Sequence, residues 1–296
     1  MDMRSSTTSY KNDIENASKM IEVESNSSEQ GSGIGTWSRF KYELTSDDLL
    51  KEPDGSIVDV ERAFAPEPAR RTALIRAGLV SFNMGIWVYD MIDGHVDKYY
   101  MIYLTRWTIV SSIAYLIASF LCAALPRSEV FEDNGTNEVQ RPRLIAKIAW
   151  ELYALSAPGG LIVVLMYWVA IYDGRTIIFL NLWRHGILAL SVILDGVFVG
   201  SVPIRAKQIR NIAAYELLFL TWSIVHIFAG IGNGEKENDD EEEENDDAIY
   251  GVLNWKERPA TAVIISLIVV IVVSPLMFYI CWISYLKLSR RKIIRV

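Results

Sequence analysis

Long apolar runs separated by shorter polar stretches dominate the chain after about residue 70. Six such runs are visible, at about 72–91, 102–125, 144–172, 177–200, 209–231 and 260–286. Each run reaches the ~20 residues that a helix needs to cross ~30 Å of hydrocarbon. The many ten-residue alternating strands of a membrane barrel are not seen in the sequence. The pattern therefore predicts an all-α fold, a polytopic bundle of six transmembrane helices.

The rest of the chain divides around this bundle. Residues 1–70 are rich in Ser, Asn and Glu and lack sustained periodicity, which predicts a mostly disordered cytoplasmic region. Within it, a short helix on the membrane surface is expected between about Trp37 and Ala65. The six-helix membrane domain is predicted over 71–287 and a basic cytoplasmic tail over 288–296. Pro158-Gly-Gly160 interrupts the third run and predicts a kink there.

The distribution of basic residues predicts the orientation. Lys and Arg are more frequent on the cytoplasmic side of membrane helices. They are concentrated before the first run and after the second, fourth and sixth, at Arg62, Arg70, Arg71, Arg127, Arg141, Arg143, Arg205, Lys207, Lys287, Arg290, Arg291, Lys292 and Arg295. Both termini are therefore predicted to be cytoplasmic, in an integral protein of the endoplasmic reticulum, another endomembrane or the plasma membrane.

The negative charge belongs to one loop. The formal net charge is −7, but residues 235–247 hold ten acids and one Lys, so the rest of the chain sums to +2. This balance does not fit a basic nucleic-acid-binding protein, and no nucleic acid partner is expected. The acidic loop, 232–250, is predicted to lie on the outer or lumenal side. It lacks the spaced ligands and turn glycine of an EF-hand.

A cluster of polar residues lies inside the fourth run, at Asn181-Leu-Trp-Arg-His185. Ionisable side chains within a membrane span are costly and often functional. With the predicted orientation, Thr105 in the second helix and His226 in the fifth lie in the same outer layer of the membrane as this cluster. A Thr hydroxyl becomes a nucleophile when a base accepts its proton, and His is the usual base near neutral pH. Thr105 and His185 are therefore a candidate catalytic pair.

Other residues near this pair have candidate roles. Asn181 precedes His185 by four residues and would share its helix face, so it could orient the imidazole or donate to an oxyanion. Arg184 or main-chain N–H groups could add to an oxyanion hole. His226 is a secondary candidate. The sequence contains no His-Glu-x-x-His motif, and neither a metal nor a cofactor is implied.

The same residues also have structural interpretations. A Thr at the start of a membrane helix often packs helices together or bonds the backbone, and a buried His can do the same. Asp195 lies roughly 15 Å deeper than His185, too far to bond it directly, and could pair with Arg205 or with a base on a neighbouring helix. Glu216 in the fifth helix has no partner that the sequence identifies. A small transporter is a weaker possibility, prompted by the interrupted third helix.

Several segments resemble, in order and spacing, the androgen-induced and androgen-dependent membrane protein family, including its rolling stone branch, which is implicated in myoblast fusion. The resemblance covers about residues 99–286. The segments are Tyr103-Leu-Thr-Arg-Trp107, Ala157-Pro-Gly-Gly-Leu-Ile-Val-Val, Tyr167-Trp168, Ile171-Tyr-Asp173, Asn181-x-x-x-His185, and Trp222, His226 and Gly230 followed by Ile249-Tyr250.

Enzymes of this family hydrolyse fatty acid esters of hydroxy fatty acids with a threonine nucleophile and a histidine. The resemblance implies that Thr105 is the nucleophile, His185 the base and Asn181 the matching asparagine. The family enzymes have a further histidine where this chain has Asn181-Leu182, and a hydroxyl residue where Gly186 stands. The implied function is hydrolysis of a lipid ester that enters laterally from the bilayer. The alternative is a non-enzymatic rolling stone-like scaffold or fusion factor.

Glycosylation tests the predicted orientation. The sequons at Asn16-Ala-Ser, Asn26-Ser-Ser and Asn134-Gly-Thr all fall on the predicted cytoplasmic side, so we expect none to carry a glycan. Expression in a eukaryotic membrane followed by endoglycosidase digestion checks this. No shift in mobility is expected. A glycan at Asn134 would contradict the predicted orientation and favour the opposite one.

Overall fold

The computed structural model describes residues 35–64, 68–93, 99–132, 141–172, 174, 176–232 and 248–293. The predictions for residues 1–34, for the core of the acidic loop at 233–247, for the Asn134 sequon and for 294–296 fall outside this part of the chain. The described chain forms two compact units, Met1–Ile57 and Val58–Val296.

The first unit contains one helix, α2 (Thr36–Thr45), in the region where a short helix was expected. Its Arg39 bonds Glu43 at 3.0 Å, one helical turn away, and also pairs with Glu52 in the following loop. Lys51 and Ile57 form a bridge that closes this loop. These contacts fold residues 36–57 back on themselves.

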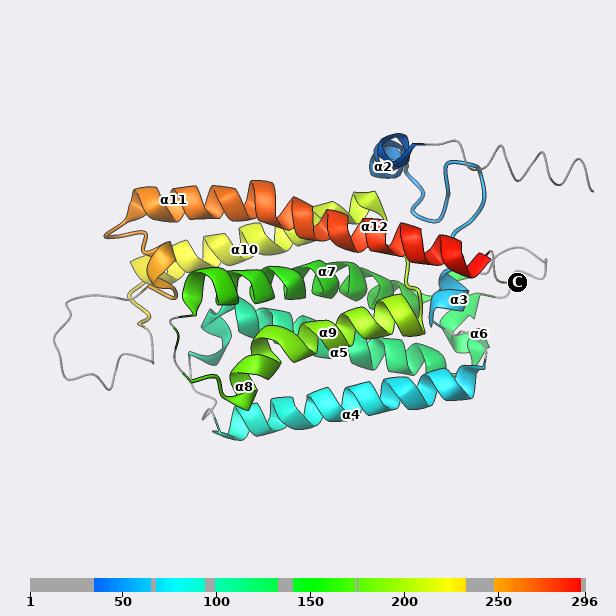
Figure 1. Ribbon diagram of the computed structural model, residues 1–296, viewed down its shortest axis with the longest axis horizontal. Coiled ribbons are helices and arrows are strands. Elements are labelled where there is room, and N and C mark those ends of the chain that lie inside the picture. Colours follow the sequence, from blue (N-terminus) through cyan, green and yellow to red (C-terminus); the bar gives the residue numbers. More distant parts are fainter. Residues whose placement is uncertain are drawn as a thin grey trace, which may run out of the picture. The chain divides into compact units, whose positions relative to one another are not determined.

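The second unit is a helical bundle (Figure 1). Its short elements are α3 (Val60–Phe64), η1 (Tyr100–Ile102), α6 (Arg127–Val130), β1 (Phe131–Glu132), β2 (Arg141–Pro142), η5 (Ala206–Gln208) and η6 (Gly251–Leu253). Its long elements are α4 (Ala69–Asp93), α5 (Leu104–Ala124), α7 (Leu144–Met166) with η2 (Tyr167–Ile171), α8 (Phe179–Leu182) with η3 (Trp183–Ile187), α9 (Leu188–Ile193) and η4 (Leu194–Val199), α10 (Ile209–Phe228), and α11 (Pro259–Ile268) with η7 (Val269–Val273) and α12 (Ser274–Ile293).

Five continuous helices in the described chain are long and apolar enough to cross a membrane. They are Leu104–Ala124, Leu144–Ile171, Phe179–Val199, Ala206–Phe228 and Pro259–Leu288. The prediction of an all-α fold with several apolar helices is thus confirmed, whereas a count of six spans is not. The helix in the first predicted span, α4, has 25 residues but includes Arg76, Asn83 and Asp90, and it is not among the five.

The third long helix, α7, lies at the centre of the unit and contacts α5, α9, α10 and α12 (Figure 1). It continues through Pro158 to Met166, so the Pro-Gly-Gly sequence does not interrupt it. A Cβ added to Gly160 would lie 2.9 Å from the Cβ of Ala189. The small residues in the middle of α7 therefore allow the close approach of α9.

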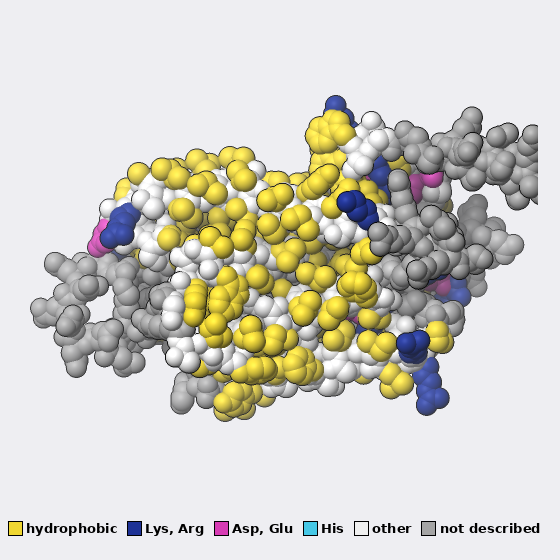
Figure 2. Space-filling view, viewed as in Figure 1, with side chains coloured by type: hydrophobic (Ala, Val, Ile, Leu, Met, Phe, Trp, Pro, Cys, Tyr) yellow, Lys and Arg dark blue, Asp and Glu magenta, His cyan; other side chains and the backbone are white. Residues whose placement is uncertain are grey.

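The outward faces of the long helices are apolar. Exposed side chains include Leu218 and Phe228 on α10 and Ile264 and Ile271 on the last segment. Figure 2 shows hydrophobic side chains over the middle of the visible face of the bundle. A surface of this kind, continuous over several helices, is typical of contact with lipid rather than water.

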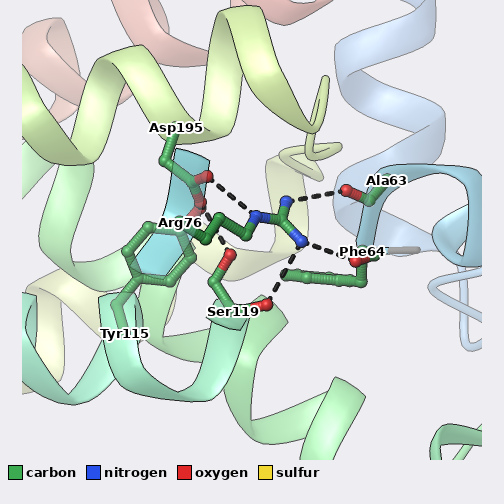
Figure 3. Close-up of polar contacts among 6 residues, drawn as sticks. All are labelled: Ala63, Phe64, Arg76, Tyr115, Ser119 and Asp195. Carbon is green, nitrogen blue, oxygen red and sulfur yellow. Dashed lines mark hydrogen bonds and ion pairs between the residues drawn. The ribbon is translucent and has the colours of Figure 1, made fainter. Parts of the chain in front are cut away.

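A buried ion pair links α4 to the fourth segment, Phe179–Val199. Arg76 is 1% exposed, and its Nε donates to Oδ1 of Asp195, which is fully buried, at 2.8 Å. The hydroxyls of Tyr115 and Ser119 on α5 donate to Oδ2 of Asp195 at 2.6 and 2.7 Å (Figure 3). These four residues are called the Asp195 cluster below. Asp195 pairs with a base on a neighbouring helix, one of the two expected arrangements, and not with Arg205.

The guanidinium of Arg76 also binds the segment that precedes α4. Its terminal nitrogens donate to the carbonyl oxygens of Phe64 at 2.5 Å and Ala63 at 3.1 Å, both on α3, and to that of Ser119 at 3.2 Å (Figure 3). These carbonyl oxygens accept from the guanidinium N–H groups that do not bond the Asp195 carboxylate. The charged and hydroxyl groups of this buried network therefore all have partners. A buried charge is tolerated when it is paired and hydrogen-bonded in this way.

Two glycines allow this network to form. A Cβ added to Gly196 would lie 2.0 Å from Cε2 of Tyr153, and one added to Gly200 would lie 2.6 Å from Nη2 of Arg76. Both glycines lie on or directly after the π-helical segment η4, which also carries Asp195. Larger residues at either position would push the fourth segment away from its neighbours.

A pair of Gly→Ala variants tests this packing. We expect Gly196→Ala to lower the free energy of unfolding by about 1–3 kcal/mol or more, because the methyl group overlaps the Tyr153 ring. The matched control is Gly85→Ala on α4, where a Cβ meets nothing within 4 Å. It should be neutral or stabilise by up to ~1 kcal/mol through helix propensity. Unfolding in mixed micelles measures both, and equal stability of the two variants would contradict the packing.

Candidate functional site

A second ionic cluster lies at the opposite end of α4. The Asp90 carboxylate is fully buried and accepts from two arginines, Arg106 at the start of α5 and Arg184 on η3. Nε of Arg184 donates to Oδ1 of Asp90 at 2.8 Å, and Nη1 of Arg106 donates to Oδ2. These three residues are called the Asp90 cluster. It holds the beginnings of α5 and of the fourth segment beside the end of α4.

Thr105, the predicted nucleophile, lies in the first turn of α5. The carbonyl of Tyr103 accepts from the N–H groups of Arg106 at 3.0 Å and Trp107 at 3.3 Å. The first N–H groups of a helix have no acceptor within it. In the described part of the chain, those of Leu104 and Thr105 make no hydrogen bond. Main-chain donors are therefore available close to the Thr105 hydroxyl.

An apolar cavity of about 70 Å³ adjoins Thr105. It is enclosed by the start of α5, the end of α7 with η2, α10, the loop at η6, and α11 with η7. The few side chains in its wall with polar atoms are Thr105, Tyr167, Glu216, Tyr250 and Ser266. One water needs about 10–15 Å³ of such space, so the cavity exceeds a single water site. Its lining of Leu, Ile, Val and Phe suits a hydrocarbon chain.

His185, the predicted base, is buried beside this cavity but does not line it. It lies on the π-helical segment η3 with φ −114° and ψ 23°, outside the helical range. Its ring stacks on that of Tyr167, with centroids 3.5 Å apart and planes 3° apart. Its carbonyl accepts from Nε1 of Trp168 at 2.9 Å. Its Nδ1 has no hydrogen-bond partner among the described residues. π-Helical turns are frequent at functional sites.

The residue common to the surroundings of Thr105 and His185 is Tyr167. Tyr167 lines the cavity with Thr105 and stacks on His185. Between the described side chains of Thr105 and His185 there is no hydrogen bond. The structure thus brings both residues to the same end of the bundle, one beside each arginine of the Asp90 cluster.

The other predicted site residues make no hydrogen bond to this pair in the described part of the chain. Asn181 is half-buried on α8 and does not bond Nδ1 of His185. Arg184 binds Asp90, so its Nε and one Nη point to a carboxylate and not to Thr105. His226 is fully buried on α10, where its ring lies 5.9 Å from that of Trp222, and it does not line the cavity.

Glu216 is a buried acid in the cavity wall, and its partner is now identified. It is 3% exposed, and the Ser274 hydroxyl lies 2.5 Å from each of its carboxyl oxygens. Ser274 also lies 2.9 Å from the carbonyl oxygen of Val269. The acid therefore joins α10 to the start of α12 and contributes a polar group to an otherwise apolar wall.

Asp90, Arg76 and Tyr167 were not predicted as site or network residues from the sequence. For the two charged residues the signal was present, since both lie inside the first apolar run, where ionisable groups are rare and usually paired. For Tyr167 no signal in the sequence distinguishes a ring that stacks on His185 from one at the membrane interface.

Comparisons of the chain with protein-family models, with curated proteins and with solved structures find no match. Within the described residues, no group of three or more His, Cys, Asp or Glu side chains is placed to hold a metal ion. The family resemblance of the motifs stays a prediction, and the site is interpreted from its own geometry.

Proposed function

We propose that this chain is an integral membrane hydrolase of lipid esters in which Thr105 is the nucleophile, as its resemblance to the androgen-induced family implies. The observation that carries the proposal is the position of Thr105. Its side chain borders an apolar cavity between apolar helices, in a helical turn whose first two N–H groups have no acceptor among the described residues. A lipid chain in the cavity would bring its ester to the hydroxyl from within the bilayer.

The proposal includes α4 as a sixth span. Its 25 residues would extend about 37 Å as a helix, enough to cross the hydrocarbon. Isolated charges would make α4 costly to place in a bilayer, and the ion pairs of the Asp195 and Asp90 clusters lower that cost. Arg76 is paired with Asp195, and Asp90 is paired with Arg106 and Arg184. With six spans, both termini lie on the same side of the membrane.

In the proposed reaction, Oγ of Thr105 bonds to the ester carbonyl carbon while His185 accepts its proton. The N–H groups at the start of α5 donate to the developing oxyanion. His185 then protonates the leaving alcohol oxygen, which yields an acyl-threonine. A water that loses its proton to His185 attacks the acyl carbon, the acid departs and Thr105 regains a proton. The reaction requires the His185 imidazole and the Thr105 hydroxyl to come within hydrogen-bonding distance of each other, which they are not in this structure.

A second candidate function is a non-enzymatic membrane scaffold of the rolling stone type. One observation favours it. The imidazole of His185 stacks on Tyr167 and makes no hydrogen bond with Thr105. In this case Thr105 and His185 only pack helices, and their substitution lowers stability without removing any chemistry.

Covalent labelling distinguishes the two functions. We expect a fluorophosphonate probe to label the wild-type chain in membranes, Thr105→Ala to abolish labelling, and His185→Ala to slow it by about 10²–10⁴-fold, the usual contribution of a general base. Thr108→Ala is the matched control, since Thr108 is buried on the same helix and lies outside the cavity wall. It should label like the wild type at equal folded levels.

The other outcomes are equally clear. A folded wild-type chain that never labels favours the scaffold. Labelling that survives Thr105→Ala means that another residue is the nucleophile.

A further inference from the structure

The Asp90 cluster contains more positive than negative charge. Arg106 and Arg184 share the single carboxylate of Asp90, so the three side chains sum to +1. In the part of the chain that the structure describes, neither arginine bonds another acid. A buried or half-buried surplus charge of this kind attracts an anion, because few solvent molecules are present to screen it.

The two arginines also have unfilled donors. A guanidinium carries five N–H groups. Arg106 uses only Nη1 toward Asp90, and Arg184 uses Nε and Nη2. Their other N–H groups have no acceptor among the described residues. The side chains are 14% and 21% exposed, so a ligand can reach these donors while Asp90 itself is covered.

The arginines are held in place before any ligand arrives. Asp90 fixes both guanidinium groups from one side, and the Tyr100 ring lies 4.4 Å from the guanidinium carbon of Arg106. Trp87 donates to the hydroxyl of Tyr100 at 2.7 Å and so fixes that ring. Guanidinium groups that are held in place in this way are a usual means of recognising a carboxylate or phosphate.

We propose that Arg106 and Arg184, aligned by Asp90, form a binding site for an anionic group, a carboxylate or a phosphate. Arg106 and Arg184 are the chain neighbours of Thr105 and His185, and neither arginine lines the apolar cavity. An amphiphile in the membrane could place its acidic group on the arginines while its chain lies against the apolar outer faces of the helices. The site needs no hydrolysis and stands independently of the proposed function.

Photocrosslinking of the full chain in a neutral detergent tests this site. Two probes of equal chain length are compared, a photoreactive analogue of oleate and the corresponding alcohol. We expect Arg106→Gln and Arg184→Gln each to lower labelling by the oleate analogue about tenfold, because a charge-assisted hydrogen bond is lost. Labelling by the alcohol should not change. Each single variant leaves Asp90 paired with the other arginine, so the fold is retained.

The matched control is Arg127→Gln. Arg127 is also paired with an acid, Glu61, but it is 63% exposed and lies at the other end of the bundle. This variant should label like the wild type with both probes.

Competition with excess inorganic phosphate distinguishes a site for small free anions from a site for an anionic lipid. If phosphate displaces the oleate analogue, the site accepts small free anions, and if it does not, the site is specific for an anionic lipid. Both results support an anion site at the arginines. Equal labelling by acid and alcohol, or a tenfold preference for the acid that persists in both arginine variants, would overturn the proposal.

Discussion

The ion pair between Arg76 and Asp195 is the interaction on which the arrangement of α4, α5 and the fourth segment depends. Neither side chain is more than 1% exposed, and each would be an isolated charge in an apolar interior without the other. Such a charge costs far more than the loss of an ordinary contact. Because Tyr115, Ser119 and the carbonyls of α3 fill the remaining lone pairs and donors, the pair also fixes the relative positions of four elements.

The Asp90 cluster repeats this principle at the other end of the same three helices. Asp195 and Asp90 lie near opposite ends of the helices that they join, and each is bonded by an arginine from another helix. The helices are thereby held in register along their length. The functional consequence concerns Thr105 and His185, which are each next to an arginine of the Asp90 cluster. Their common location at one end of the bundle follows from the ion pairs and not from any contact between them.

The apolar pattern predicted most of the fold correctly, because the five spans of the described chain are long, predominantly apolar runs. It did not identify which helices are neighbours. Arg76 and Asp195 are 119 positions apart, and nothing in local periodicity connects them. The charged residues of α4 are explained by their partners on other helices, Asp195 for Arg76 and the two arginines for Asp90.

The candidate site was predictable in its location and not in its contacts. Thr105 and His185 were expected in one layer, and they do lie at one end of the bundle. The expectation that Asn181 supports His185 assumed a regular helix between them. The π-helical segment η3 and the non-helical φ and ψ of His185 break this regularity, and Asn181 does not bond Nδ1 of His185. The stacking of Tyr167 on His185 depends on this local geometry too.

The measurement that tests this account most directly is a double-mutant cycle on Arg76 and Asp195, with the free energy of unfolding determined in mixed micelles. Asp195→Asn should cost about 3–5 kcal/mol when Arg76 is present, because it leaves a buried guanidinium without its counter-charge. The same substitution should cost much less in a chain that already carries Arg76→Met, so the two effects will not add. Equal costs of Asp195→Asn in both backgrounds would show that the ion pair does not hold these helices together.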